Sequence, residues 1–177
     1  MTTRTRTLLA LATLTTLAIA TTTGCSPHPE PTPTPTAAIA TEEEAFAEAE
    51  EVYRAYNEAG NARRDGATEP DPQAFLIGNA LEGDIDARNV FRDHGLEPRG
   101  NSQITEFTGV EYDNSTADST VVAHVCLDVT DVRVFDSSGR DVTPVTRPDL
   151  VAQSVTFVMT GSVLRISEED SLEEASC

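Results

Sequence analysis

The sequence has no lysine and no tryptophan, and all twelve of its cationic side chains are arginines. Thirty Asp and Glu residues outnumber them, so the formal net charge is −18 at pH 7. A protein that binds nucleic acid presents a cationic surface to the phosphates, so this composition excludes nucleic acid as an expected partner. The acidity also gives no attraction to anionic lipid headgroups, so attachment to a membrane would require an apolar anchor.

The motifs of common catalytic and metal sites are missing as well. The sequence contains no CxxC or HExxH, no GxSxG or SxxK, and no glycine-rich phosphate loop. His28, His94 and His124 are scattered, and the acidic runs at 42–44 and 168–170 lack the Asp/Asn/Gly alternation of a calcium loop. We therefore expect no metal, no cofactor and no enzymatic activity, and we expect both acidic runs to be solvated.

Residues 1–24 have the layout of an export signal. Arg4 and Arg6 precede an uncharged run of apolar and threonine residues at 8–20. This run is shorter than the roughly 20 residues that span a bilayer, and it is typical of the apolar part of a secretory signal peptide.

The end of this leader, Gly24 followed by Cys25, resembles the lipobox of bacterial lipoproteins, with Thr22 where that motif usually has Leu, Val or Ala. The resemblance implies that the Cys25 thiol receives a diacylglyceryl group and becomes the first residue of the mature chain. We therefore expect a lipid anchor on the extracytoplasmic face of the cell membrane. The alternative is an ordinary signal peptide cut nearby, which would leave Cys25 as a free thiol.

Residues 25–40 are a linker in which five prolines alternate with other residues between 27 and 35, and threonines fill the positions 32, 34 and 36. Proline at this density favours extended polyproline II structure and prevents helix and sheet. At about 3.1 Å per residue the linker reaches roughly 45 Å, which would lift a folded domain away from the membrane.

Two more cysteines, Cys126 and Cys177, follow the linker. In an exported protein such a pair predicts one disulfide, which here would join the last residue of the chain to the middle of the domain. The alternative is two unpaired thiols.

The folded domain begins at Thr41, where Thr41 and Glu44 match a helix-capping box. A helix is predicted from here to about Gly60, with Arg63 and Arg64 near its last carbonyl groups. Its apolar stripe consists of Phe46, Ala49, Val52, Tyr53, Tyr56 and Ala59.

Two shorter helices are predicted next. The first covers 73–80, and the second covers 83–94, with Asp84 as its N-cap and Gly95 as its stop. The side chains of the second helix expected to face the core are Ile85, Val90 and Phe91.

The rest of the chain has the pattern of β-structure. Residues 120–129 alternate well, with Val121, Ala123 and Val125 on one face and His124 and Cys126 on the other. The other predicted strands are 103–112 with a bulge near Gly109, 150–160, and 163–167 before an acidic tail. Residues 132–135 either extend the strand at 120–129 or form a short strand of their own. The expected fold is α+β, with N-terminal helices packed on a curved antiparallel sheet of about four strands.

Residues 41–177 resemble actinobacterial lipoproteins with an NTF2-like (cystatin-like) domain. The resemblance rests on the Glu-rich start, the stretch at 49–56, Gly95 and Gly100, the strand end at 126–128, and the late hairpin at Gly161. Such proteins often have a tryptophan at the start of the last strand, where this chain has Ser162-Val163-Leu164. The resemblance implies a cone-shaped domain whose mouth binds small molecules in some relatives, and copies that pair through the sheet as homodimers.

Tyr53 and Tyr56 lie on the inward stripe of the first helix and form the candidate pocket; the alternative is that both are core aromatics with satisfied hydroxyls. His124 and Asp128 share one strand face four residues apart, and as a dyad they are the weaker candidate because that face is expected to point outward.

The leading functional expectation is a non-catalytic binding or scaffolding module that is anchored to the membrane and has an unidentified partner. The alternative is a small-molecule binder or enzyme that uses the interior of the cone. A hollow cone lined by Tyr53, Tyr56 and a carboxylate would favour the alternative. An interior filled by aromatic side chains would favour the module; the expected set is Phe46, Phe75, Phe91 and Phe157.

Overall fold

A computed structural model describes residues 39, 41–115, 118–172 and 177. The predicted export signal at 1–24, Cys25, and all of the linker except residue 39 lie outside the described residues, so lipidation stays a prediction. In the part of the chain that is described, no helix is long and apolar enough to cross a membrane.

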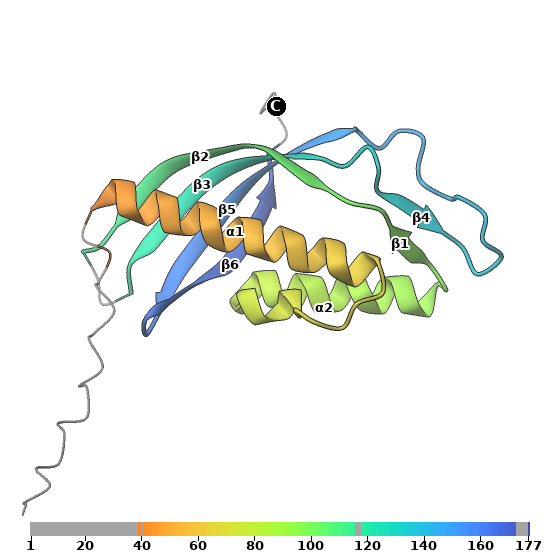
Figure 1. Ribbon diagram of the computed structural model, residues 1–177, viewed down its shortest axis with the longest axis horizontal. Coiled ribbons are helices and arrows are strands. Elements are labelled where there is room, and N and C mark those ends of the chain that lie inside the picture. The colour runs from red at the N-terminus through yellow and green to blue at the C-terminus, as the bar shows by residue number, and fades with distance from the viewer. Residues whose placement is uncertain (1–38, 40, 116–117, 173–176) are drawn as a thin grey trace, which may run out of the picture. The chain divides into compact units, whose positions relative to one another are not determined.

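Two helices pack on a curved antiparallel sheet of four strands, as the sequence predicts, and the fold is α+β. Helix α1 (Glu42–Arg64) runs across the strands, and α2 (Gly78–Asp93) lies beside it (Figure 1). The sheet has the order β2-β3-β5-β6, and a separate two-stranded ribbon pairs β1 with β4. The strands are β1 (Glu97–Arg99), β2 (Gln103–Asp113), β3 (Thr120–Asp128), β4 (Arg133–Phe135), β5 (Leu150–Thr160) and β6 (Val163–Ser171).

The predicted capping box begins α1. The Thr41 hydroxyl accepts a hydrogen bond from the Glu44 N–H at 3.2 Å, and the Glu44 carboxylate accepts one from the Thr41 N–H at 3.3 Å. Gly60 lies near the end of the helix, which continues to Arg64, and Arg63 and Arg64 are in its last turn as predicted. Its last turn is held from outside the helix, because the side chains of Arg63 and Arg64 bind groups on α2 and on the segment after β1.

The predictions for the second helical region were wrong in two respects. In place of a helix over 73–80 there is a short 3-10 helix, Pro72–Phe75, after which the Ile77 N–H donates to the Ile166 carbonyl of β6 at 2.8 Å. Helix α2 therefore starts at Gly78, and Asp84 lies inside it instead of capping it. Ile85 and Val90, expected in the core, are 41% and 54% exposed.

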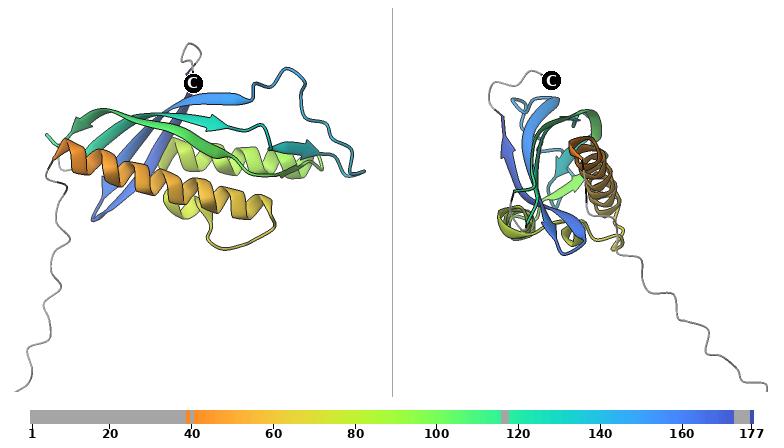
Figure 2. Two further views of the ribbon diagram at one scale, coloured as in Figure 1. Left: turned by 45° about the horizontal axis from the view of Figure 1, so that its top comes forward. Right: turned by 90° about the vertical axis from the view of Figure 1, so that its left-hand side faces the viewer.

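The inner face of the sheet carries the core. Val121, Ala123 and Val125 of β3 are fully buried, as their alternation predicts, and each pairs with a residue of β5. Phe46 of α1 sits directly against Gly109 of β2, where an added Cβ would lie 2.3 Å from the ring. The strand has a register break at this position, next to the glycine, as predicted. Figure 2 shows the resulting curvature of the sheet around α1.

Cys126 and Cys177 form a disulfide with a Cα–Cα distance of 5.5 Å. Cys126 lies on the outer face of β3, opposite the helices, since Val125 on the inner face is buried against the core. The last residue of the chain is therefore fastened to the centre of the sheet.

Candidate functional site

Tyr53 and Tyr56, the predicted pocket residues, meet a carboxylate of β6. The Tyr53 hydroxyl lies 2.9 Å from Gln153 Oε1 and 3.2 Å from Glu169 Oε1, and the Tyr56 hydroxyl donates to Glu169 Oε2 at 3.0 Å. The two tyrosines are three residues apart on α1, so both rings leave the same face of the helix. We refer to Tyr53, Tyr56 and Glu169 as the tyrosine–glutamate cluster.

Glu169 was expected in a solvated acidic tail, and that expectation was wrong. Strand β6 extends to Ser171, and Glu169 pairs with Val155 on the inner face of the sheet. Simple alternation from Ile166 would turn position 168 inward instead. A register shift between the pairs Phe157–Ile166 and Thr156–Glu168 moves the inward position to 169.

The electrostatics of the cluster keep the phenols neutral. Burial raises the pKa of Tyr53 and of Tyr56 above their usual range, and the neighbouring Glu169 carboxylate raises both further. Burial also raises the pKa of Glu169, against the opposing effect of the hydrogen bonds from Tyr56 and Tyr53. The tyrosines therefore act as hydrogen-bond donors to the carboxylate and not as bases.

The space between α1 and the sheet is filled at Tyr53. Its ring contacts the rings of Tyr56, Phe107 and Phe157, with centroid distances of 5.7, 6.5 and 6.4 Å. Tyr53 and Phe157 are 1% and 0% exposed. Beyond them Tyr56 and Glu169 border an open cleft of about 350 Å³ on the α2 side. Hence Tyr53 is a core aromatic, whereas Tyr56 reaches a surface cavity.

The phenylalanines expected to fill the interior divide into two groups. Phe157 is in the core and Phe46 packs against it, but Phe75 and Phe91 line surface clefts. Phe91 lies on the far part of α2, which faces the β1–β4 ribbon and not the sheet. The interior is filled by Phe157, Phe107 and Tyr53 instead.

We expect the unfolding free energy of the Glu169→Gln variant, relative to the parent protein, to rise between pH 4 and pH 7. The folded-state pKa of Glu169 is raised, so the folded state holds this proton more tightly than the unfolded chain. In the parent protein the protonated Glu169 side chain therefore stabilises the folded state fully below the unfolded-state pKa of about 4.3, and this stabilisation is lost as the pH rises through the folded-state pKa. The glutamine of the variant does not titrate and has no such loss. Urea unfolding of both proteins at the two pH values measures the difference.

Glu168→Gln is the matched control for that measurement, since it removes one charge at the neighbouring position, which accepts a hydrogen bond from Asn79 at 2.8 Å. A Glu169→Gln variant whose relative stability falls toward pH 7 would contradict the raised pKa.

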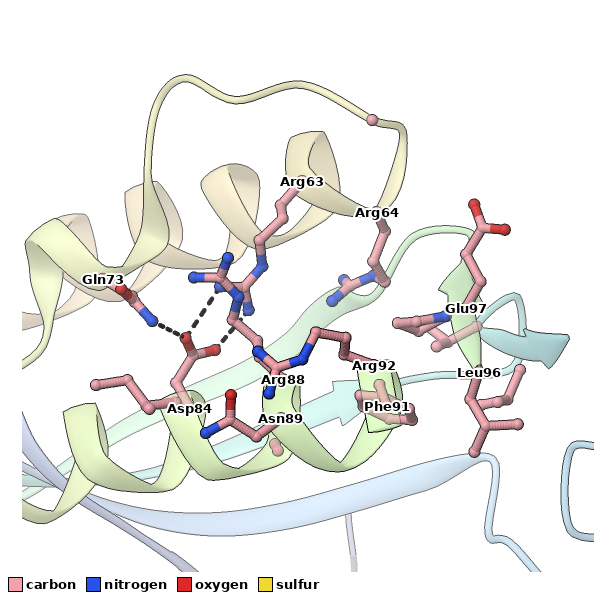
Figure 3. Close-up of a pocket in the computed structure, with 16 residues that line it drawn as sticks. Arg63, Arg64, Gln73, Asp84, Arg88, Asn89, Phe91, Arg92, Leu96 and Glu97 are labelled. Carbon is pink, nitrogen blue, oxygen red and sulfur yellow. Dashed lines mark hydrogen bonds and ion pairs between the residues drawn. The ribbon is translucent and has the colours of Figure 1, made fainter. Parts of the chain in front are cut away.

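A larger cleft, of about 780 Å³, lies between the end of α1, α2 and the β1–β4 ribbon (Figure 3). We call it the arginine cleft, because Arg63 and Arg64 of α1 and Arg88 and Arg92 of α2 line it. Sequence analysis placed two of these arginines near the end of the first helix but did not bring the four together. The only signal for it was the spacing of Arg88 and Arg92, which puts both on one face of α2.

Asp84 anchors one side of this cleft. Its carboxylate accepts two hydrogen bonds from the Arg63 guanidinium, at 3.0 and 2.5 Å, and one from Gln73 at 2.9 Å (Figure 3). Burial opposes the ionised form, but the bonds from Arg63 and Gln73 outweigh it and the pKa of Asp84 is lowered. The residue predicted as a helix cap therefore joins α2 to the end of α1.

His124 and Asp128 do not form a dyad in the structure. His124 is exposed, and the Asp128 carboxylate accepts a hydrogen bond from the Thr130 N–H at 2.9 Å. Among the described residues no group of three or more His, Cys, Asp or Glu side chains is placed to hold a metal ion.

No family model matches the chain, and no curated protein matches it. Among solved structures it is similar to the intermembrane space region of the chloroplast protein ARC6, with 15% identity and a TM-score of 0.49 over 72% of this chain and 95% of that one. It is also similar to Aln2 from a Streptomyces species, with 16% identity and a TM-score of 0.41 over 76% and 93% of the two chains. Likenesses at this level carry no argument about family or activity.

Proposed function

We propose that this protein is a non-catalytic binding module that a lipid on Cys25 holds at the outer face of the cell membrane. The leader at 1–24 and the Pro/Thr-rich linker at 25–40 support export, anchoring and a distance from the membrane surface. The observation that carries the non-catalytic reading is the closed interior. Tyr53 is buried, and both phenols donate their protons to acceptors within the protein.

The proposed domain type is NTF2-like, as in the actinobacterial lipoproteins that the sequence resembles. The order of elements supports this assignment, because helices come first and the four sheet strands follow with α1 packed across them. Pairing of two copies through the sheet belongs to the same proposal.

The anchor is tested in a bacterial host that exports and lipidates lipoproteins. We expect the full chain to incorporate labelled palmitate and to partition into the detergent phase, and Cys25→Ala to lose both properties. Ser26→Ala is the matched control and should behave like the parent protein. Membrane association that persists in Cys25→Ala would overturn the proposed anchor.

The tyrosine–glutamate cluster supports a second candidate function, a small-molecule site that uses the cleft beside Tyr56. A thermal-shift screen of the full chain with metabolites, steroids and lipids separates the two. If the protein is a non-catalytic module, we expect Tyr56→Phe to lower the unfolding free energy by about 1 kcal/mol through its lost hydrogen bond. The substitution should then not change the thermal shift that any compound of the screen causes. A ligand whose stabilising shift disappears in Tyr56→Phe would favour the second function.

A further inference from the structure

The arginine cleft is positively charged, although the protein as a whole is strongly negatively charged. Outside the leader the chain has ten arginines, and four of them line this one cavity. Among the described residues the carboxylates that line it are those of Asp84 and Glu97, and Glu97 is paired with Arg99 at 2.7 Å. The cavity therefore has an excess of positive charge in a protein whose net charge is −18. Such a concave patch attracts anions, whereas the surrounding acidic surface repels them.

Two of the four guanidinium groups, those of Arg64 and Arg88, form no ion pair with a carboxylate of the described residues, although the charge of Arg88 helps to lower the pKa of Asp84. Arg64 donates to neutral oxygens only: the Gly100 carbonyl at 2.9 Å, the Ser102 hydroxyl at 2.8 Å, and the Asn61 amide oxygen. No carboxylate in the described part of the chain lies within salt-bridge distance of Arg64 or Arg88. Burial and the neighbouring Arg63 lower the pKa of Arg64, so this charge is held at a cost that a bound anion would relieve.

The other two arginines differ in how firmly they are held. Arg63 is fixed by its two bonds to Asp84, which orients the group in the wall of the cleft. Arg92 is paired with its neighbour Asp93 at 3.1 Å, but both side chains are more than 60% exposed. An ion pair this exposed contributes little, so Arg92 is free to turn toward a ligand.

The remaining wall of the cleft is apolar. Phe91 of α2, Leu96 and Val134 of β4 face the same cavity as the arginines. Figure 3 shows Phe91 and Leu96 at one end of the cleft and the Asp84 network at the other. A small inorganic ion would leave this wall uncovered, and a purely apolar molecule would leave the guanidinium groups without a partner.

We propose that the arginine cleft binds a small organic anion, in which a phosphate or carboxylate group is attached to an apolar body. The planar fork of each guanidinium matches the paired oxygens of either group. Arg64, Arg88 and Arg92 bind the anionic oxygens, and Phe91 and Leu96 cover the apolar body. This inference rests on the proposed function, since it gives the binding module a ligand class. The arginine cleft shares Asp84 and Ala87 with the cleft beside Tyr56, but neither Tyr56 nor Glu169 is among its lining residues.

The test is calorimetric titration of the full chain, in non-ionic detergent, with four probes. Phenyl phosphate and benzoate carry both features, inorganic phosphate lacks the apolar body, and benzyl alcohol lacks the charge. We expect one or both aromatic anions to bind more tightly than the other two probes, with affinity that falls as salt is raised. The tighter of phenyl phosphate and benzoate then identifies the anionic group.

The variant for this test is Arg88→Gln/Arg92→Gln, because both side chains are exposed on α2 and their replacement leaves the core intact. We expect it to weaken the aromatic anion by about tenfold or more, the effect of one or two lost charge-assisted hydrogen bonds. Arg54→Gln/Arg140→Gln changes the net charge equally at exposed positions elsewhere, and should bind like the parent protein.

Equal binding by both double variants, equal binding of benzyl alcohol, or no binding of either aromatic anion at millimolar concentration would overturn the proposal. The lipid anchor and the Tyr56→Phe result do not depend on this measurement. A failure at the arginine cleft is therefore distinguishable from a failure of the proposed function.

Discussion

Gly100→Ala is expected to lower the free energy of unfolding by about 2–5 kcal/mol. This loss is the sum of the cost of backbone strain and the cost of overpacking. Gly100 has φ +88°, a left-handed conformation that side chains disfavour, and an added Cβ would lie 2.1 Å from the carbonyl oxygen of Asp131. That oxygen belongs to the backbone and cannot rotate away, so the segment after β1 has to move. Urea denaturation of the parent protein and the variant measures the loss.

Gly139→Ala separates the two causes. Gly139 has a similar φ of +79°, but nothing lies within 4 Å of an added Cβ. We expect this control to lose only about 1–2 kcal/mol, the cost of left-handed strain alone. Equal losses for the two variants would show that the contact with Asp131 is relieved at no cost. Because the Gly100 carbonyl accepts a hydrogen bond from Arg64, we also expect Gly100→Ala to weaken anion binding in the arginine cleft.

Removal of the disulfide is the second large expected effect. Cys126 and Cys177 are 51 residues apart, and in the chain-entropy account a loop of this length stabilises the fold by about 4 kcal/mol. Cys126→Ser/Cys177→Ser should therefore shift the urea midpoint strongly downward. Reduction of the parent protein should reproduce that shift, and Cys25→Ser should leave the midpoint unchanged. A double variant as stable as the parent would mean that the terminal residues contribute nothing to holding β6.

The parts of the fold that were predicted correctly depend on neighbours in sequence. The capping box at Thr41 and Glu44 needs only residues three apart, and the alternation of β3 needs only a strand with one buried face. The order of helices and strands followed from these local patterns, and it was sufficient for the α+β class.

The wrong predictions concern side chains whose positions depend on residues that are distant in the sequence. Asp84 has the residue type of a helix cap, but α2 starts at Gly78, after Ile77, whose N–H donates to the Ile166 carbonyl of β6. The Asp84 carboxylate inside the helix binds Arg63, 21 residues earlier. Glu169 lies in an acidic run, and only the register shift in β6 turns it toward Tyr53 and Tyr56. Neither the contact between α1 and α2 nor the register shift in β6 can be recognised from the residues that are neighbours in the sequence. The candidate pocket was therefore predicted as two tyrosines and an unidentified carboxylate, which the structure identifies as Glu169.

Strand β2 forms one border of the sheet, and among the described strands only β3 pairs with it. The register of this pair is broken twice, between Ile104 and Glu106 and again between Gly109 and Glu111. A border strand with a regular row of free N–H and C=O groups invites strand addition by another copy of the chain, and irregularities of this kind interrupt the row. The two breaks that help curve the sheet around α1 thus also protect the domain against edge-to-edge aggregation.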